Sequence, residues 1–128
     1  MDIILHITKR EQWEEAKLKK TYYGNTLESQ GFIHCSTPKQ VIRVANAVFH
    51  ARKELVCLCI ETAKVRSEIR YEGTGGELYP HIYGPLNADA VIKVLNFEPR
   101  KDGSFTLPKG IANTSMQQRR RHCRRKRI

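Results

Sequence analysis

Short apolar runs alternate with polar stretches along the chain and predict a series of strands. Residues 3–7 form an apolar run interrupted by His6, and residues 32–35 form a second short run. Residues 54–61 enclose six consecutive apolar side chains, so both alternating faces are hydrophobic, as is typical of a central strand covered on both sides. Residues 68–72 predict a weaker strand.

Two stretches carry signals of helix starts. Thr8 and Glu11 match a capping box and predict a helix over residues 9–20. Residues 37–40 then supply an N-cap threonine, a proline in the first turn and a reciprocal glutamine. Apolar side chains follow at helical spacing and predict a buried helical stripe made of Val41, Val44, Ala45 and Val48.

The segments after residue 78 have a less regular pattern. Residues 79–85 contain two prolines, which cannot donate to a β-ladder, so we expect an edge strand or a bent loop. Residues 91–98 and 104–107 predict two strands joined at a hairpin-like turn around Asp102 and Gly103. The mixture of strands and helices predicts an α+β fold.

Composition places this pattern in one globular domain of about residues 1–108. The chain has 128 residues, of which 40% are hydrophobic and 28% charged, within the range of globular proteins. No apolar run approaches the roughly 20 residues that cross a bilayer, and the first residues lack the pattern of a signal peptide. Four cysteines without disulfide-framework spacing suit a reducing compartment. We therefore expect a cytoplasmic protein with no membrane partner.

Positive charge is concentrated in residues 109–128. The formal net charge is +10, and this segment contributes +8 because it holds eight lysines or arginines and no acidic residue. It has no apolar periodicity, so we expect a basic tail that is disordered when free. Such a run binds nucleic-acid backbones without sequence preference, or is only a solvated extension, and the sequence leaves both open.

Three histidines lie inside or beside the apolar strand segments. His6, His34 and His81 are therefore candidates for one site, although a lone strand histidine is most often a hydrogen-bonded structural residue. Imidazoles suit acid–base chemistry, recognition of ribose or phosphate, or a metal. Ser36 and Thr37 follow the second histidine at a helix start, where they either favour an anionic ligand or only cap the helix.

Aromatic and acidic residues surround the third histidine. Tyr79 and Tyr83 lie in a segment rich in proline and glycine, which suits a rigid wall on which a planar ring stacks, or the cover of a core edge. Glu72 and Glu77 are the nearby carboxylates. Either one accepts a hydrogen bond from a ribose hydroxyl or acts as a base, unless it is only a solvated charge.

Several of these segments, in this order, resemble the bacterial family catalogued as domain of unknown function 952. The resemblance covers about residues 3–108 and rests on Leu5-His6-Ile7, Gly31-Phe32-Ile33-His34-Cys35-Ser36, Val44-Ala45-Asn46 and Tyr79-Pro80-His81-Ile82-Tyr83-Gly84-Pro85-Leu86. That family is distantly similar to the ADP-ribosyltransferase fold, a split β-sheet that binds NAD. The resemblance implies a small split sheet, mixed or antiparallel, with two or three helices.

The same resemblance implies roles for site residues. In the related tRNA 2′-phosphotransferases the first strand ends in a histidine, and the second carries a histidine before a small hydroxyl residue. His6, and His34 with Ser36, match that layout. It implies that His6 contacts a ribose hydroxyl and that His34 lies against the nicotinamide or a phosphate. The site would be completed by Glu72, His81 or Tyr83.

The leading hypothesis is an NAD- or nucleotide-binding enzyme of ADP-ribosyltransferase or phosphotransferase type, with no metal. In this hypothesis the catalytic residues are His34, His81 and Glu72, and the ligand-binding residues are His6, Ser36 and Tyr83. One alternative is a non-catalytic interaction protein whose basic tail binds nucleic acid. Another is a metal site made of the three histidines. The oligomeric state stays open, and the tertiary structure decides whether the histidines converge.

Overall fold

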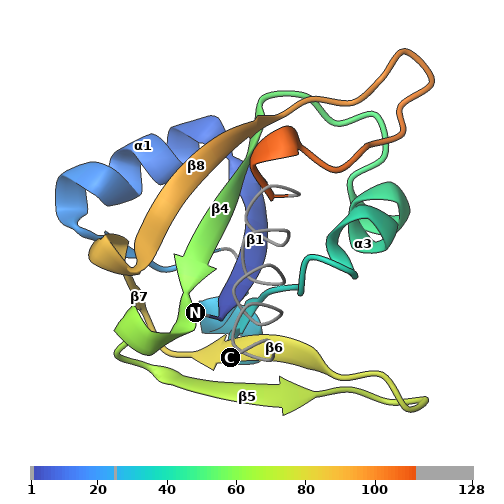
Figure 1. Ribbon diagram of the computed structural model, residues 1–128. Helices are drawn as coiled ribbons and strands as arrows, with labels where there is room; N and C mark the ends of the chain where they lie inside the picture. The colour runs from blue at the N-terminus through green and yellow to red at the C-terminus, as the bar shows by residue number, and fades with distance from the viewer. Residues whose placement is uncertain (1, 25, 112–128) are drawn as a thin grey trace, which may run out of the picture.

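A computed structural model describes residues 2–24 and 26–111 and places β4 at the centre of the first sheet. Its strands are antiparallel in the order β1-β4-β8, with β1 at Ile3–Lys9, β4 at Leu55–Glu61 and β8 at Val91–Phe97 (Figure 1). The central position confirms the prediction made from the continuous apolar run.

Each face of β4 packs against a separate hydrophobic cluster. The first cluster contains Trp13 from α1 (Arg10–Lys19), and the second contains Val41 from α3 (Val41–Val48). Full burial of an aliphatic side chain contributes about 1.5–3 kcal/mol, so a strand that is buried on both faces ties the two clusters together. By alternation, Val56, Leu58 and Ile60 belong to the first cluster, and Leu55, Cys57 and Cys59 to the second.

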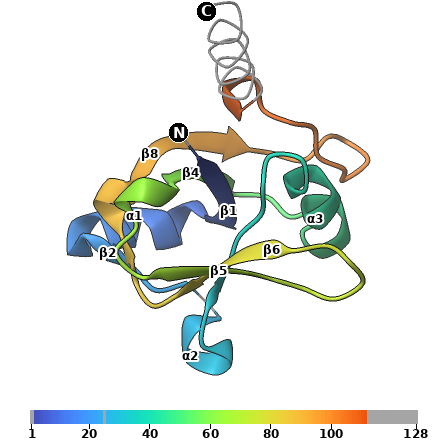
Figure 2. The same ribbon diagram turned by 60° about the horizontal axis from the view of Figure 1, so that its bottom comes forward.

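A second three-stranded sheet closes the first cluster. Its antiparallel order is β3-β6-β5, with β3 at Ile33–His34, β6 at Tyr79–Tyr83 and β5 at Glu68–Glu72. Ile33 and Ile82 face each other in this sheet, and both are 0% exposed. In Figure 2 the β5–β6 hairpin crosses the front of the molecule and α2 projects beneath it.

Short elements connect the two larger sheets. They are β2 (Thr21–Tyr22), which pairs with β7 (Leu86–Asn87), the helix α2 (Leu27–Gln30), and the 3-10 helices η1 (Thr62–Lys64) and η2 (Ala88–Ala90). The strands paired within the described residues are all antiparallel, so the structure confirms an α+β fold with antiparallel sheets.

The prediction that residues 79–85 form an edge or a bent loop is wrong, because β6 is the middle strand of its sheet. Pro80 O accepts a hydrogen bond from Cys35 N–H at 3.0 Å. In an antiparallel ladder the nitrogen and oxygen of one residue point to the same neighbour, so the Pro80 nitrogen faces the end of β3. The proline therefore removes one possible backbone hydrogen bond, at the position where the pairing of β6 with β3 already ends.

The helix starts agree with the sequence only in part. The capping box at Thr8 is wrong, because β1 continues through Lys9 and the Thr8 hydroxyl hydrogen-bonds to Gln12 at 2.8 Å. At α3 the predicted reciprocal contact is present, since Thr37 N–H donates to Gln40 Oε1 at 3.1 Å. Val48 is 58% exposed, so the buried stripe ends before it.

The predicted strand at residues 104–107 is not formed. A turn closes where Arg100 N–H donates to the Ser104 carbonyl at 2.8 Å. The Phe105 ring then stacks on Phe97, with ring centroids 4.7 Å apart. Ring packing replaces ladder pairing in this segment, and a sequence pattern does not distinguish the two.

The packed core extends beyond the domain end predicted at residue 108. Ile111 is 2% exposed and belongs to the second cluster. Residues 112–128, which make up most of the predicted basic tail, lie outside the described residues. Among the described residues, no helix is long and apolar enough to span a bilayer.

Replacing Ile111 tests whether this segment anchors the core. We expect Ile111→Ala to lower the free energy of unfolding by about 2–4 kcal/mol, because it removes a fully buried aliphatic side chain. Urea denaturation measures the change. Leu107→Ala is the control, since that side chain is 38% exposed and its loss should cost less than about 1 kcal/mol. Equal losses in the two variants would contradict the anchoring role.

Candidate functional site

Alternation along β6 divides its side chains between the core and the opposite face of its sheet. Pro80 and Ile82 are buried, whereas Tyr79, His81 and Tyr83 are only partly buried. We call the face that carries these three the outer face of the β3-β6-β5 sheet. The register places His34 of β3 and Arg70 of β5 on either side of His81, and so brings two of the three predicted histidines side by side.

A carboxylate on β5 joins His81 to Tyr83. Glu72 Oε1 lies 3.0 Å from His81 Nδ1 and accepts a hydrogen bond from the Tyr83 hydroxyl at 2.5 Å. The hydrogen bonds from Tyr83 and His81 lower the pKa of Glu72, so the carboxylate is ionised at neutral pH. An ionised carboxylate only accepts, and Nδ1 of His81 therefore carries a hydrogen and leaves Nε2 to a ligand. The structure thus brings Glu72, His81 and Tyr83 together.

Aromatic rings surround this hydrogen-bonded group. The Phe32 ring stacks on His81 with centroids 4.2 Å apart and lies 4.7 Å from the His34 ring. The His34 and His81 rings meet edge to face at 5.3 Å. Phe32 also lies 5.2 Å from the Tyr83 ring, so it holds all three partners in place. Phe32 belongs to the family motif, but neither its spacing nor its residue type marked it as a member of the site.

His34 is held at its other end by α2. Its Nε2 lies 2.5 Å from the Gln30 Oε1 atom, and an amide oxygen only accepts, so Nε2 carries the hydrogen. Partial burial, together with the neighbouring His81, lowers the pKa of His34. The ring is therefore neutral at pH 7, with an acceptor lone pair on Nδ1.

Two arginines flank the outer face. The Arg70 guanidinium lies 4.4 Å from the Tyr83 ring centroid and pairs with Glu68 at 3.1 Å. At the other end, Arg43 of α3 forms an ion pair with Glu77 and donates to the Tyr79 hydroxyl at 3.2 Å. Glu77 thus serves as an arginine partner, whereas Arg70 adds positive charge beside the His81 group.

His6 points into the protein rather than onto the outer face. Its Nδ1 lies 2.5 Å from the His34 carbonyl oxygen, and its Nε2 lies 2.7 Å from the Tyr22 hydroxyl. Tyr22 in turn contacts Thr8 Oγ1 at 2.9 Å, and Thr8 contacts Gln12. His6 therefore joins the site through the backbone of β3, and this contact connects the outer sheet to the core.

The His6 ring is held in its neutral form. A carbonyl oxygen only accepts, so Nδ1 carries the hydrogen that bonds to His34. Burial lowers the pKa of His6 to about 4, so the ring is neutral at pH 7 and its unprotonated Nε2 lies 2.7 Å from the Tyr22 hydroxyl. Burial also raises the pKa of Tyr22 to about 12, so that the phenol keeps its hydrogen.

The segment after His34 is buried rather than open to a ligand. Ser36 is 5% exposed, and its backbone exchanges two hydrogen bonds with Leu5 at 2.7 and 2.8 Å. Cys35 is also buried, and that burial raises the pKa of its thiol well above the usual range. Cys35 is therefore a neutral thiol of the core, and Ser36 links β1 to the segment that follows β3.

The three-histidine metal site is not formed. The His6 nitrogens face Tyr22 and the His34 carbonyl, while Nδ1 of His81 faces Glu72. In residues 2–24 and 26–111, no group of three His, Cys, Asp or Glu side chains is arranged to hold a metal ion.

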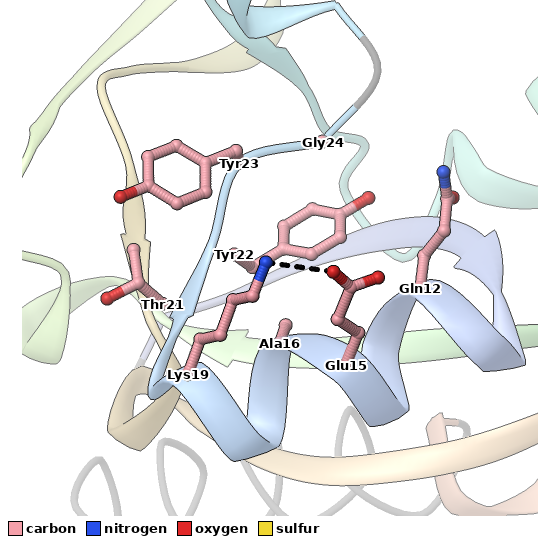
Figure 3. Close-up of a pocket in the computed structure, with 8 residues that line it drawn as sticks. All are labelled: Gln12, Glu15, Ala16, Lys19, Thr21, Tyr22, Tyr23 and Gly24. Carbon is pink, nitrogen blue, oxygen red and sulfur yellow. Dashed lines mark hydrogen bonds and ion pairs between the residues drawn. The ribbon is translucent and has the colours of Figure 1, made fainter.

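A separate hollow lies between α1 and the segment that follows β2. It encloses about 150 Å³ and is lined by Gln12, Glu15, Ala16, Lys19, Thr21, Tyr22, Tyr23 and Gly24 (Figure 3). An ion pair between Lys19 and Glu15, at 2.8 Å, lies along the helix side. The hollow shares Gln12 and Tyr22 with the His6 hydrogen bonds. The sequence contained no signal for it, because its residues are common ones on a helix and a loop.

The neutral state of His6 predicts an acid-sensitive fold. In the unfolded chain a histidine takes up a proton near pH 6.5, whereas folded His6 does so only near pH 4. The free energy of unfolding should therefore fall as the pH drops through this window, by about 3 kcal/mol from His6. His34, whose pKa is also lowered, acts in the same direction. Urea denaturation between pH 7 and pH 4 measures the loss.

His6→Gln provides the comparison, because an amide makes hydrogen bonds but does not titrate. Its unfolding free energy should depend less on pH in this window than that of the unchanged protein. An equal dependence in the two proteins would show that His6 is not the titrating group.

Comparisons with known proteins place the chain in a family. No curated protein matches it. The crystal structure of protein CC0527 from Caulobacter crescentus is similar, with 28% identity and a TM-score of 0.79 over 86% of this chain and 98% of that one. The solution NMR structure of CC0527 has a TM-score of 0.70, with 28% identity over 81% of this chain and 91% of that one.

The family profile described as "Protein of unknown function (DUF952)" matches residues 7–94, which include β3, β5 and β6 and the site residues on them, whereas His6 of β1 lies just before the matched range. That description names no activity, so it leaves the chemistry to be argued from the site. The chain belongs to this family, DUF952.

Proposed function

We propose that the outer face of the β3-β6-β5 sheet binds NAD or another nucleotide, in an enzyme-like domain of ADP-ribosyltransferase type. The observation that carries the proposal is the group in which Glu72 holds both His81 and Tyr83 beside the His34 ring. Oriented imidazoles and an ionised carboxylate in a partly exposed position suit proton transfer and the recognition of ribose hydroxyl groups.

Each part of a nucleotide has a chemical partner on this face. The rings of Phe32 and Tyr83 suit stacking on a base or on nicotinamide. The Glu72 carboxylate suits a ribose hydroxyl group, and the Arg70 guanidinium suits a phosphate. Aromatic, acidic and cationic groups thus adjoin one another within one sheet.

The roles of the predicted residues are adjusted to their positions. His34, His81 and Glu72 act as catalytic groups, and Tyr83 contacts the ligand. His6 and Ser36 act as positioning residues, because they hold β3 against β1 through the His34 carbonyl and the Leu5 backbone. The proposal includes a cytoplasmic location, which the free buried thiols of Cys35, Cys57 and Cys59 support.

The alternative hypothesis, a non-catalytic interaction protein, rests on nucleic-acid binding by the basic tail. Residues 112–128 of that tail lie outside the described residues. Nucleic-acid binding by that tail therefore stays a prediction. A deletion that tests it should begin after Ile111, because this residue is part of the second core cluster.

Ligand-observed NMR with NAD, ADP-ribose and AMP tests the proposal. We expect binding of at least one of them, and we expect Arg70→Ala to weaken it about 10-fold through loss of a charged contact to phosphate. Arg66→Ala is the matched control, because Arg66 pairs with Asp89 on the surface at 3.2 Å and its side chain is 76% exposed. The absence of binding at millimolar ligand, or equal weakening by both variants, would remove the proposal.

A further inference from the structure

The two adjacent histidines of the outer face each have one nitrogen committed and one available. His81 uses Nδ1 for Glu72, and His34 uses Nε2 for Gln30. Within residues 2–24 and 26–111, no hydrogen-bond partner faces Nε2 of His81 or Nδ1 of His34. His34 is exposed, and the His81 side chain keeps 13% of its surface in solvent. Both available nitrogens therefore belong to a surface that a small ligand can reach.

The surroundings of the two rings give them opposite roles in proton transfer. The Glu72 carboxylate accepts a hydrogen bond from Nδ1 of His81 and so orients the ring with Nε2 as the nitrogen that can donate to a ligand. Among the described residues His34 has no carboxylate partner, and its partial burial lowers its pKa, so its Nδ1 is an acceptor at neutral pH. The rings lie 5.3 Å apart, which allows one to accept a proton and the other to donate one at a single reacting centre.

The charge beside this pair suits a phosphodiester. Arg70 is opposite His81 in the strand register, and its guanidinium lies against the Tyr83 ring. This guanidinium, which also pairs with Glu68 at 3.1 Å, is the cation beside the two histidines that suits a phosphodiester with its single negative charge. When the leaving group is a sugar hydroxyl, it must receive a proton as the phosphorus–oxygen bond breaks, and a protonated histidine supplies it.

We infer that this site hydrolyses ribonucleoside 2′,3′-cyclic phosphates, with His34 as general base and His81 as general acid. The inference rests on the proposed function, because it uses the same nucleotide site and names its substrate class. A five-membered cyclic phosphate is strained and open to attack by water, so an acid–base pair with one cation suffices. Tyr83 and Phe32 stack on the base, and Glu72 orients His81.

The reaction proceeds in one balanced displacement. A water oxygen attacks phosphorus, and its proton passes to Nδ1 of His34. One of the two bonds between phosphorus and the ribose oxygens breaks, and that oxygen takes the proton from Nε2 of His81. Proton exchange with solvent returns His34 to its neutral form and His81 to its protonated form. The product is a nucleoside monophosphate, formed from the cyclic phosphate and one water molecule.

Hydrolysis of adenosine 2′,3′-cyclic phosphate, followed by ³¹P NMR, tests the inference on the full chain. We expect turnover with a bell-shaped dependence of kcat/KM on pH, since one histidine must be neutral and the other protonated. Neighbouring groups act on the titration of both rings. Those that face His34 are His81, Gln30 and the His6 ring beneath its carbonyl. Those that face His81 are Glu72, Arg70, Tyr83 and His34.

Variants of the two histidines separate catalysis from structure. His34→Ala and His81→Ala should each lower kcat/KM by about 100-fold or more. The first should abolish the acidic limb of the pH profile and the second the alkaline limb, and added imidazole should restore part of the rate. If an alanine variant does not fold, His34→Gln and His81→Asn preserve the hydrogen bonds to Gln30 and Glu72 without a titrating ring.

His50→Ala is the matched control, because His50 is an exposed histidine that follows α3, outside the outer face, and its loss should leave the rate unchanged. Binding of adenosine nucleotides without turnover would overturn the inference and leave the proposed function in place. Absence of both binding and turnover would remove both. If both histidine variants hydrolyse the substrate at the unchanged rate, the inference would also be overturned, because the activity would then come from a contaminating protein.

Discussion

Burial of β4 on both of its faces is the constraint on which the rest of this structure depends. A strand with six consecutive apolar residues needs two covers, and the protein supplies a different one on each side. On one side α3 and the aromatic pair Phe97 and Phe105 pack against it. On the other side, α1 and the β3-β6-β5 sheet both pack against it, the sheet through Ile33 and Ile82. The sheet that carries the candidate site is therefore part of the core, and its opposite face is left for polar and aromatic side chains.

His6 connects that core to the site. Strand β1 is paired with β4 along its whole length, and the His6 ring reaches from it to the carbonyl of His34. A second link, the backbone pairing of Leu5 with Ser36, lies next to it in the chain. Two adjacent contacts from a buried strand thus set the position of β3. His6 shapes the candidate site although its own nitrogens point inward, and the same residue makes the fold sensitive to acid because it is buried without charge.

The outer face brings together side chains that, taken one at a time in the sequence, do not indicate a site. Glu72 is one carboxylate among many in the sequence, yet the pleat of β5 and β6 brings it to both His81 and Tyr83. Phe32 directly precedes β3, and its ring contacts the rings of both His34 and His81. Hydrogen bonds at one nitrogen of each ring leave the other available. Proton transfer is the chemistry that such an arrangement supports most directly, and the adjacent Arg70 favours an anionic ligand.

The sequence by itself determined the features that depend on near neighbours. The apolar run of β4 predicted a central strand, and Gln40 predicted the contact with Thr37 in the turn before α3, because both follow from residues close together in the chain. The tertiary structure alone decided the rest. Thr8 lies in strand β1, and not at a helix start, because it pairs with β4. Pro80 fits into a central strand because β3 ends opposite its nitrogen, so no hydrogen-bond donor is needed there. The meeting of His34 with His81, and the turning of His6 into the core, depend on strand register between distant segments. Register is set by how whole sheets bury their apolar faces, and no local pattern contains that information.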